Sequence, residues 1–250
     1  MQSKYLNSKL IINFDVDRNI LSSSARVYEE KLKSNFIVPF FVVNGLPEGA
    51  DPSITRFLAN SLGGHSKVEI SQNKITLTTN FDANFCFDID KIIQYLLEKS
   101  EFLKQVIEPG KVTFMGIVIN FDTMFEEAEI LPYLAKLTGL NFLQSGVRDF
   151  TYRYSKIYNN DYVANVTVTK FQKVTFNIPM ATALTGIPVQ LKPEEGKTDT
   201  GITITIDINN KILLQKGQRF DINNLNAFFK PFDSLIKNST LDDLVVGNLK

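Results

Sequence analysis

Two aspartates, Asp15 and Asp17, directly follow an apolar run that begins at Leu10. Paired carboxylates at the end of a buried strand could hold Mg²⁺ while one of them attacks a phosphoryl group. The other carboxylate could then handle the proton of the leaving group. The spacing therefore raises one function to test, a magnesium-dependent phosphatase or nuclease that uses Asp15 and Asp17.

An Asp-x-Asp after a hydrophobic strand resembles the opening motif of haloacid-dehalogenase-type phosphatases. In that family a Gly-Thr pair usually follows and the sheet is parallel, whereas here Arg18 and Asn19 follow and the strand patterns look antiparallel. The tripeptide Asn-Phe-Asp also occurs three times, at residues 13–15, 80–82 and 120–122, and each copy closes a strand-like run. We therefore interpret these aspartates as acceptors for backbone N–H groups where a strand ends or a helix begins.

Other catalytic constellations have little support in the sequence. His65 is the only histidine and Cys86 the only cysteine, whereas ordinary zinc sites need several such ligands. A Ser-His-Asp triad would have to recruit His65 without a G-x-S-x-G turn, and neither a G-x-G-x-x-G loop nor a P-loop occurs. We therefore expect no cofactor, and a binding protein is a stronger prediction than an enzyme.

The composition is that of an ordinary globular protein, with 250 residues of which 44% are hydrophobic. Lys+Arg and Asp+Glu both number 27, so the net charge of zero gives no general attraction to nucleic acid or to an anionic membrane. One thiol cannot form an internal disulfide, and no run approaches ~18 apolar residues. We therefore expect a cytoplasmic protein that does not associate with membranes.

One segment, residues 147–173, departs from this charge balance. It contains two acids, Asp149 and Asp161, against five cations, which are Arg148, Arg153, Lys156, Lys170 and Lys173. Tyr152 and Tyr154 are interleaved with the cations, and basic plus aromatic side chains on a sheet can bind single-stranded nucleic acid. The alternation places both tyrosines on the face opposite Arg153, which favours a core role for the rings. Nucleic-acid binding by this hairpin is the second hypothesis for function.

Strand patterns dominate the chain. Residues 67–81 alternate on both sides of Gln72-Asn73, and residues 150–178 form two alternating runs around residues 159–161, so both segments predict hairpins. Residues 111–121 are almost continuously apolar, which is typical of a strand buried on both faces. Residues 201–215 predict a strand, a turn at Asn209-Asn210 and a return strand. Pro39 favours an edge position for the run at residues 36–44.

Helical signals are fewer and fall in residues 22–35, 88–105, 122–139 and 222–238. Thr123 and Glu126 have the spacing of a capping box, and Gly139 is a stop signal. Asp88 or Asp90 can cap the second of these helices. Pro231 should kink or restart the last one, because proline lacks the backbone donor.

Together these patterns predict an α+β protein, in which long, mostly antiparallel strands form one or two sheets and a few amphipathic helices pack on one face. Residues 68–77 and 206–214 each lead to Phe-Asp-Ile and an amphipathic helix, so a duplicated hairpin–helix unit is one interpretation and coincidence is the other. With duplication, the chain divides near Pro109-Gly110 into lobes of residues 1–109 and 110–250. A single domain is the alternative.

The first hypothesis for function is a non-catalytic interaction module. It rests on the lack of catalytic constellations and on the many Phe and Tyr residues in strand-like runs. Such a module would bind a protein partner, or form a homodimer, through a sheet surface or edge strands.

Overall fold

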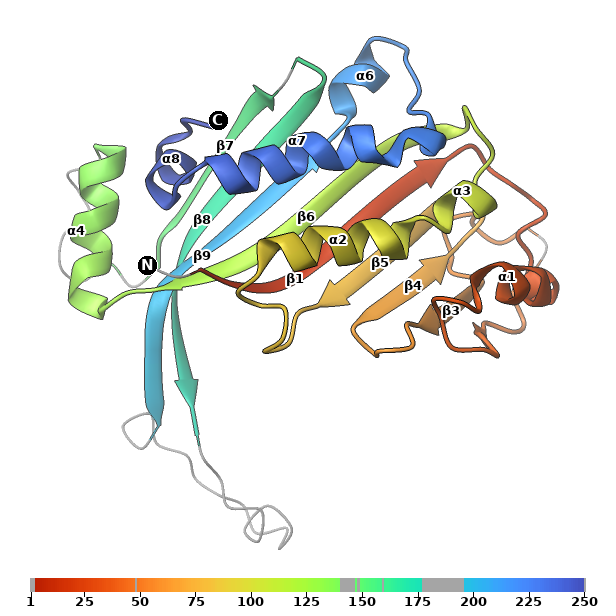
Figure 1. Cartoon of the computed structure of the whole chain (residues 1–250), viewed down its shortest axis with the longest axis horizontal. Coiled ribbons are helices and arrows are strands. Elements are labelled where there is room, and N and C mark those ends of the chain that lie inside the picture. The colour runs from red at the N-terminus through yellow and green to blue at the C-terminus, as the bar shows by residue number, and fades with distance from the viewer. Residues whose placement is uncertain are drawn as a thin grey trace, which may run out of the picture.

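A single antiparallel sheet of nine strands forms the frame of the molecule (Figure 1). The computed structural model describes residues 3–47, 49–139, 147, 149–158, 160–176 and 196–249. The strand order is β2-β3-β4-β5-β1-β6-β9-β8-β7, and every neighbouring pair is antiparallel. The predicted α+β class with antiparallel strands is therefore confirmed.

Most strands overlap the predicted apolar runs, but β1 begins earlier than its run, at Ser3, and the sequence patterns did not predict β3. The strand bounds are β1 Ser3–Phe14, β2 Phe41–Val42, β3 Phe57–Asn60, β4 Ser66–Ile70, β5 Lys74–Asn80, β6 Val112–Met124, β7 Thr151–Tyr158, β8 Tyr162–Thr175 and β9 Lys197–Asn209. The predicted hairpins are the β4–β5 and β7–β8 pairs. β1 and β6 pair at the centre, so one sheet runs across the boundary predicted near residue 109.

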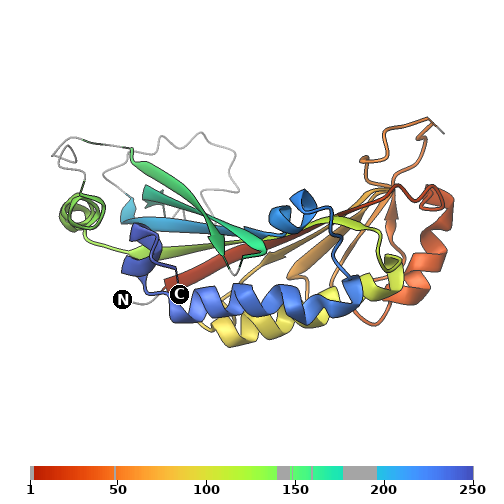
Figure 2. The same ribbon diagram turned by 90° about the horizontal axis from the view of Figure 1, so that it is seen from above.

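The helices gather mainly on one side of this sheet. They are α1 Ala25–Leu32, α2 Ile89–Ser100, α3 Leu103–Val106, α4 Glu127–Thr138, α6 Lys211–Gln215, α7 Leu225–Asn238 and α8 Leu241–Val246, with 3₁₀ turns at Ser22–Ser24 and Ile222–Asn224. Figure 2 shows α2 and α7 side by side on the same face of the sheet. Lys237 of α7 joins the two helices through its ion pair with Asp90 of α2.

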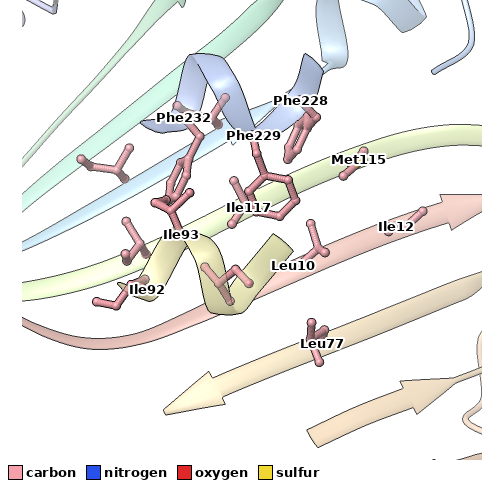
Figure 3. Close-up of a cluster of buried hydrophobic side chains, with 14 of the residues drawn as sticks. Leu10, Ile12, Leu77, Ile92, Ile93, Met115, Ile117, Phe228, Phe229 and Phe232 are labelled. Atoms are coloured by element: carbon pink, nitrogen blue, oxygen red, sulfur yellow. The ribbon is translucent and has the colours of Figure 1, made fainter. Parts of the chain in front are cut away.

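The main core lies between these two helices and the sheet. Three phenylalanines of α7, Phe228, Phe229 and Phe232, are buried together with Ile92 and Ile93 of α2 (Figure 3). Alternate residues of the strands meet them, and β9 contributes the buried set Ile202, Ile204, Ile206 and Ile208. Full burial of one such side chain stabilises the folded state by about 1.5–3 kcal/mol. Together these side chains therefore fix which face of the sheet turns toward α2 and α7.

The return strand predicted after Asn210 is wrong, because Lys211–Gln215 form helix α6. β9 already pairs with β6 on one side and with β8 on the other, so it has no free edge for another strand. Asn210 is also held by β6. Its N–H donates to the Met115 carbonyl at 3.0 Å, and its Oδ1 accepts from the Met115 N–H at 2.8 Å.

The helix ends agree with the sequence signals only in part. The capping box predicted at Thr123 is wrong, because Thr123 lies in β6 and α4 begins at Glu127. Gly139 ends α4 as predicted, with a positive φ of 71°. Asp88 caps α2 by accepting from the Lys91 N–H at 3.1 Å, and this hydrogen bond lowers the pKa of Asp88. α7 continues through Pro231 as one helix.

The two halves of the chain share a similar order of elements. β1, α1, β3, β4, β5 and α2 follow one another in the first half, and β6, α4, β7, β8, β9 and α7 in the second, with β2, α3, α6 and α8 as additions. The particular segments that suggested duplication do not correspond, because residues 68–77 form a hairpin and residues 206–214 do not. Duplication therefore stays a prediction.

Candidate interaction surface

Asp15 and Asp17 lie in the loop after β1, beside a pocket of about 110 Å³ that Glu108 and Lys111 also line. Oδ2 of Asp15 accepts from Nη1 of Arg219 at 2.5 Å, and Oδ1 of Asp17 accepts from the Asn19 N–H at 2.9 Å. Within the described residues, no group of three or more His, Cys, Asp or Glu side chains is arranged to hold a metal ion. Both carboxylates therefore have hydrogen-bond partners within the protein.

The other two copies of Asn-Phe-Asp differ from each other. Asp82 accepts from the Asn84 N–H at 2.9 Å, as expected for an aspartate at the end of a strand. Asp122 does not begin a helix as predicted, because it lies inside β6. Its carboxylate accepts from Thr203 Oγ1 of β9 at 2.6 Å and from Lys173 Nζ of β8 at 2.5 Å, so it binds side chains of the next two strands on one side of β6.

The residues of the predicted nucleic-acid hairpin separate onto the two faces of the sheet. Tyr152 and Tyr154 lie on the helix side, where the Tyr154 hydroxyl donates to the Leu244 carbonyl of α8. Burial, with a smaller contribution from Tyr152, raises the pKa of Tyr154. Lys156 also points to this side and donates to the Gly247 carbonyl at 3.1 Å.

The remaining cations of that hairpin do not form one cluster either. Lys170 is almost fully buried and pairs with Glu127 of α4 at 3.7 Å. Arg153 and Lys173 lie on the opposite face, where Lys173 pairs with Asp122. Arg148 lies outside the described residues. The structure thus does not bring the predicted set together, and strand parity was the sequence signal that could have shown this.

The long edge strand β7 is the first candidate for an interaction site (Figure 1). Phe150 accepts from the Lys170 N–H in the register of the β7–β8 ladder, so even-numbered residues of β7 direct their backbone groups to β8. The odd-numbered residues, Thr151, Arg153, Ser155 and Ile157, therefore direct their N–H and C=O groups outward. No other described segment hydrogen-bonds to the backbone of these four residues.

The opposite edge of the sheet is closed by side chains. β2 is the edge strand there, which confirms the position predicted from Pro39. Glu29 Oε1 accepts from the Phe40 N–H at 2.7 Å, and Ser22 Oγ donates to the Val43 carbonyl at 2.7 Å. These contacts occupy backbone groups of the residues just before and just after the two-residue strand. Addition of another strand is therefore better suited to β7 than to β2.

The second candidate is the sheet face that points away from α2 and α7, which we call the open face. In Figure 2, α2 and α7 both lie on the other side of the sheet from this face. Its side chains are mostly polar and bond to one another across strands. Asn120 Nδ2 donates to Asn7 Oδ1 at 2.7 Å, and Thr205 Oγ1 donates to Asn120 Oδ1 at 2.5 Å. The open face is thus a firmly held surface of amides and hydroxyls.

Sequence reasoning found the edge at Pro39 but missed both the edge at β7 and the open face. The order of strands in the sheet decides which strand is an edge, and no local pattern reports that order. The alternation of Thr and Ile in residues 202–208 did show that one face of β9 is polar.

None of the described helices has the length and apolar character needed to cross a membrane. No protein-family model, curated protein or solved structure matches this chain significantly.

Proposed function

We propose that this protein is a non-catalytic interaction module that self-associates through strand β7. The observation that supports the proposal most directly is the row of outward backbone groups on Thr151, Arg153, Ser155 and Ile157, which no other described segment binds. An edge strand in this state is a template for antiparallel pairing with another strand.

The side chains of β7 suit pairing with a second copy of the same strand. A two-fold axis at Ser155 would place Ser155 opposite its own copy, and Arg153 opposite Ile157 of the partner subunit. Tyr154 would then face Lys156 of the partner subunit, an arrangement in which a cation can lie against an aromatic ring. No like charges oppose each other directly in this register, so the strand is self-complementary.

Ser155→Pro tests this proposal. The substitution removes an outward N–H without removing a donor from the β7–β8 ladder, so it should abolish pairing while the fold is kept. Ser155→Ala is the matched control, because it loses only the hydroxyl that donates to Asn165 Oδ1 and keeps the backbone donor. Sedimentation velocity over a range of concentrations measures the association.

We expect wild type and Ser155→Ala to shift from monomer to dimer as concentration rises, and Ser155→Pro to stay monomeric. Pairing of single edge strands makes a small interface, so the dimer should dissociate on dilution. A wild-type protein that is monomeric at every concentration would contradict the proposal. Dimerisation of Ser155→Pro with unchanged affinity would exclude β7 as the interface.

A further inference from the structure

The open face carries an imbalance between its positive and negative groups. Following the register across the sheet, its carboxylates are Glu69, Asp122, Asp199 and Asp207, and its cations are Lys4, Lys9, Lys67, Lys74, Arg153, Lys173 and Lys197. Three ion pairs neutralise part of this set, Lys67–Glu69 at 2.8 Å, Lys173–Asp122 at 2.5 Å and Lys197–Asp199 at 3.0 Å.

The fourth carboxylate, Asp207, has two amide partners. Asn165 Nδ2 donates to it at 2.9 Å and Asn209 Nδ2 at 3.1 Å. Every carboxylate of the open face is therefore already hydrogen-bonded or ion-paired. Four cations, by contrast, form no ion pair with any residue that the structure describes, and these are Lys4, Lys9, Lys74 and Arg153. The surface that results can attract an anionic chain.

The cations stand among uncharged groups that both donate and accept hydrogen bonds. One register row crosses eight strands and contains Asn60, Lys67, Thr78, Lys9, Val118, Asp207, Asn165 and Ser155, so amides and hydroxyls share the row with one carboxylate and one apolar side chain. Phe114 adds a half-buried ring, which lies against the backbone of Gly116 because that residue has no side chain. One face of the sheet therefore carries lysines that can bind phosphates, amides and hydroxyls that can hydrogen-bond to base edges, and a ring on which a base can stack.

The width of the face decides between single-stranded and duplex nucleic acid. Lys9 and Arg153 lie four strand spacings apart, about 19 Å at ~4.8 Å per spacing. The major groove of a DNA duplex is only about 12 Å wide and admits a helix or a two-stranded ribbon, so this sheet cannot reach the bases of a duplex. A single strand can lie flat on such a surface with its bases turned toward the protein.

From the unpaired cations and this polar surface we infer that the open face binds single-stranded nucleic acid. The phosphates lie along Lys4, Lys9, Lys74 and Arg153, and the bases contact the Asn and Thr side chains between them. This assignment differs from the binding hairpin predicted from the sequence, because Tyr152, Tyr154, Lys156 and Lys170 play no part in it.

The test is fluorescence anisotropy with a labelled oligothymidylate of about 20 nucleotides, longer than the usual site of one sheet-based module. Two charge-reversal variants, Lys9→Glu and Arg153→Glu, each remove one proposed phosphate contact from the open face. Lys230→Glu is the matched control, because Lys230 is an exposed residue of α7 on the helix side and has the same change in charge. A duplex of equal length and polyglutamate serve as competitors.

We expect wild type and Lys230→Glu to bind with the same affinity and the same dependence on salt. Lys9→Glu and Arg153→Glu should each bind more weakly, and each should reduce the slope of log K against log salt by about 0.7. An absence of binding at low salt, or an equal loss in Lys230→Glu, would overturn the inference. If polyglutamate displaces the labelled strand as effectively as unlabelled oligonucleotide does, the open face is assigned to acidic protein segments instead. If the duplex competes equally well, the preference for single strands is overturned.

Discussion

At the scale of single residues, Gly201 shows how closely the strands around the open face are packed. A Cβ atom on Gly201 would lie 2.3 Å from the carbonyl oxygen of Thr123 and 2.8 Å from the ring of Phe171. The ring in turn lies under Lys173, whose Nζ is 4.3 Å from the ring centroid. The missing side chain therefore lets the ring of Phe171 lie against Gly201.

Gly201→Ala should for this reason destabilise the protein. The new methyl group meets a backbone atom that cannot move without disturbing the β6–β9 ladder, and overpacking of this kind typically costs about 1–3 kcal/mol. Gly49→Ala is the control, since nothing lies within 4 Å of a Cβ atom at that position. Urea unfolding of both variants measures the difference, and equal stability would refute the steric explanation.

Tyr5 provides a residue-scale prediction for alkaline pH. Burial raises the pKa of Tyr5 to about 12, whereas an unfolded chain would release the phenolic proton near the ordinary value of about 10. Above pH ~10 the folded state therefore binds more protons than the unfolded state. The contribution of Tyr5 to the free energy of unfolding is fully present below that pH and is lost as the pH rises toward 12. Burial also raises the pKa of Tyr28, Tyr133, Tyr154 and Tyr162.

Thermal unfolding between pH 8 and pH 11.5 would measure this decline. Tyr5→Phe removes one titrating group, so its melting temperature should fall less steeply across the same pH range than that of wild type. Parallel slopes for the two proteins would show that Tyr5 ionises at its ordinary pKa in the folded state.

At the scale of elements, α8 depends on the residue that precedes it, Thr240, for a defined start. Thr240 Oγ1 accepts from the Asp243 N–H at 3.1 Å, and Asp243 Oδ2 accepts from the Thr240 N–H at 2.9 Å, which together form a capping box. The helix is only six residues long, so propensity alone would not hold it. Through Leu244 it also accepts the hydroxyl of Tyr154 from β7.

Thr240→Ala should lower stability by about 1 kcal/mol, because the cap acceptor is lost. Thr240→Ser keeps the hydroxyl and should stay close to wild type. Chemical denaturation gives both values. A Thr240→Ala protein as stable as Thr240→Ser would mean that packing of Leu244 and Val245, rather than the cap, holds α8 in place.

Local patterns predicted most elements, and the failures have specific causes. The hairpin around Gln72-Asn73 and the apolar run at residues 111–121 were predicted because alternation and burial follow directly from strand geometry. α6 was missed because the local sequence of residues 211–215 resembles a strand. That local sequence does not show that β6 and β8 already pair with both edges of β9. The capping spacing at Thr123 failed because β6 continues through it to Met124.

At the scale of the whole molecule, the fold class could be predicted from the sequence, but the unpaired cations of the open face could not. Amphipathic patterns specify that helices cover one sheet face, and Figures 1 and 2 show this arrangement. Which cations remain unpaired depends on partners that are distant in sequence. Lys173 and Asp122, for example, are 51 residues apart. The candidate site therefore had to come from the assembled sheet.

The central position of β1 has a consequence for how the chain is made. β1 lies between β5 and β6, whose residues begin at Lys74 and Val112. A nascent polypeptide leaving the ribosome thus exposes its first apolar strand long before either partner has been synthesised. We therefore expect chaperones to contact residues 3–14 during translation. We also expect folding to be completed slowly after release, because β1 pairs with strands that are distant in sequence.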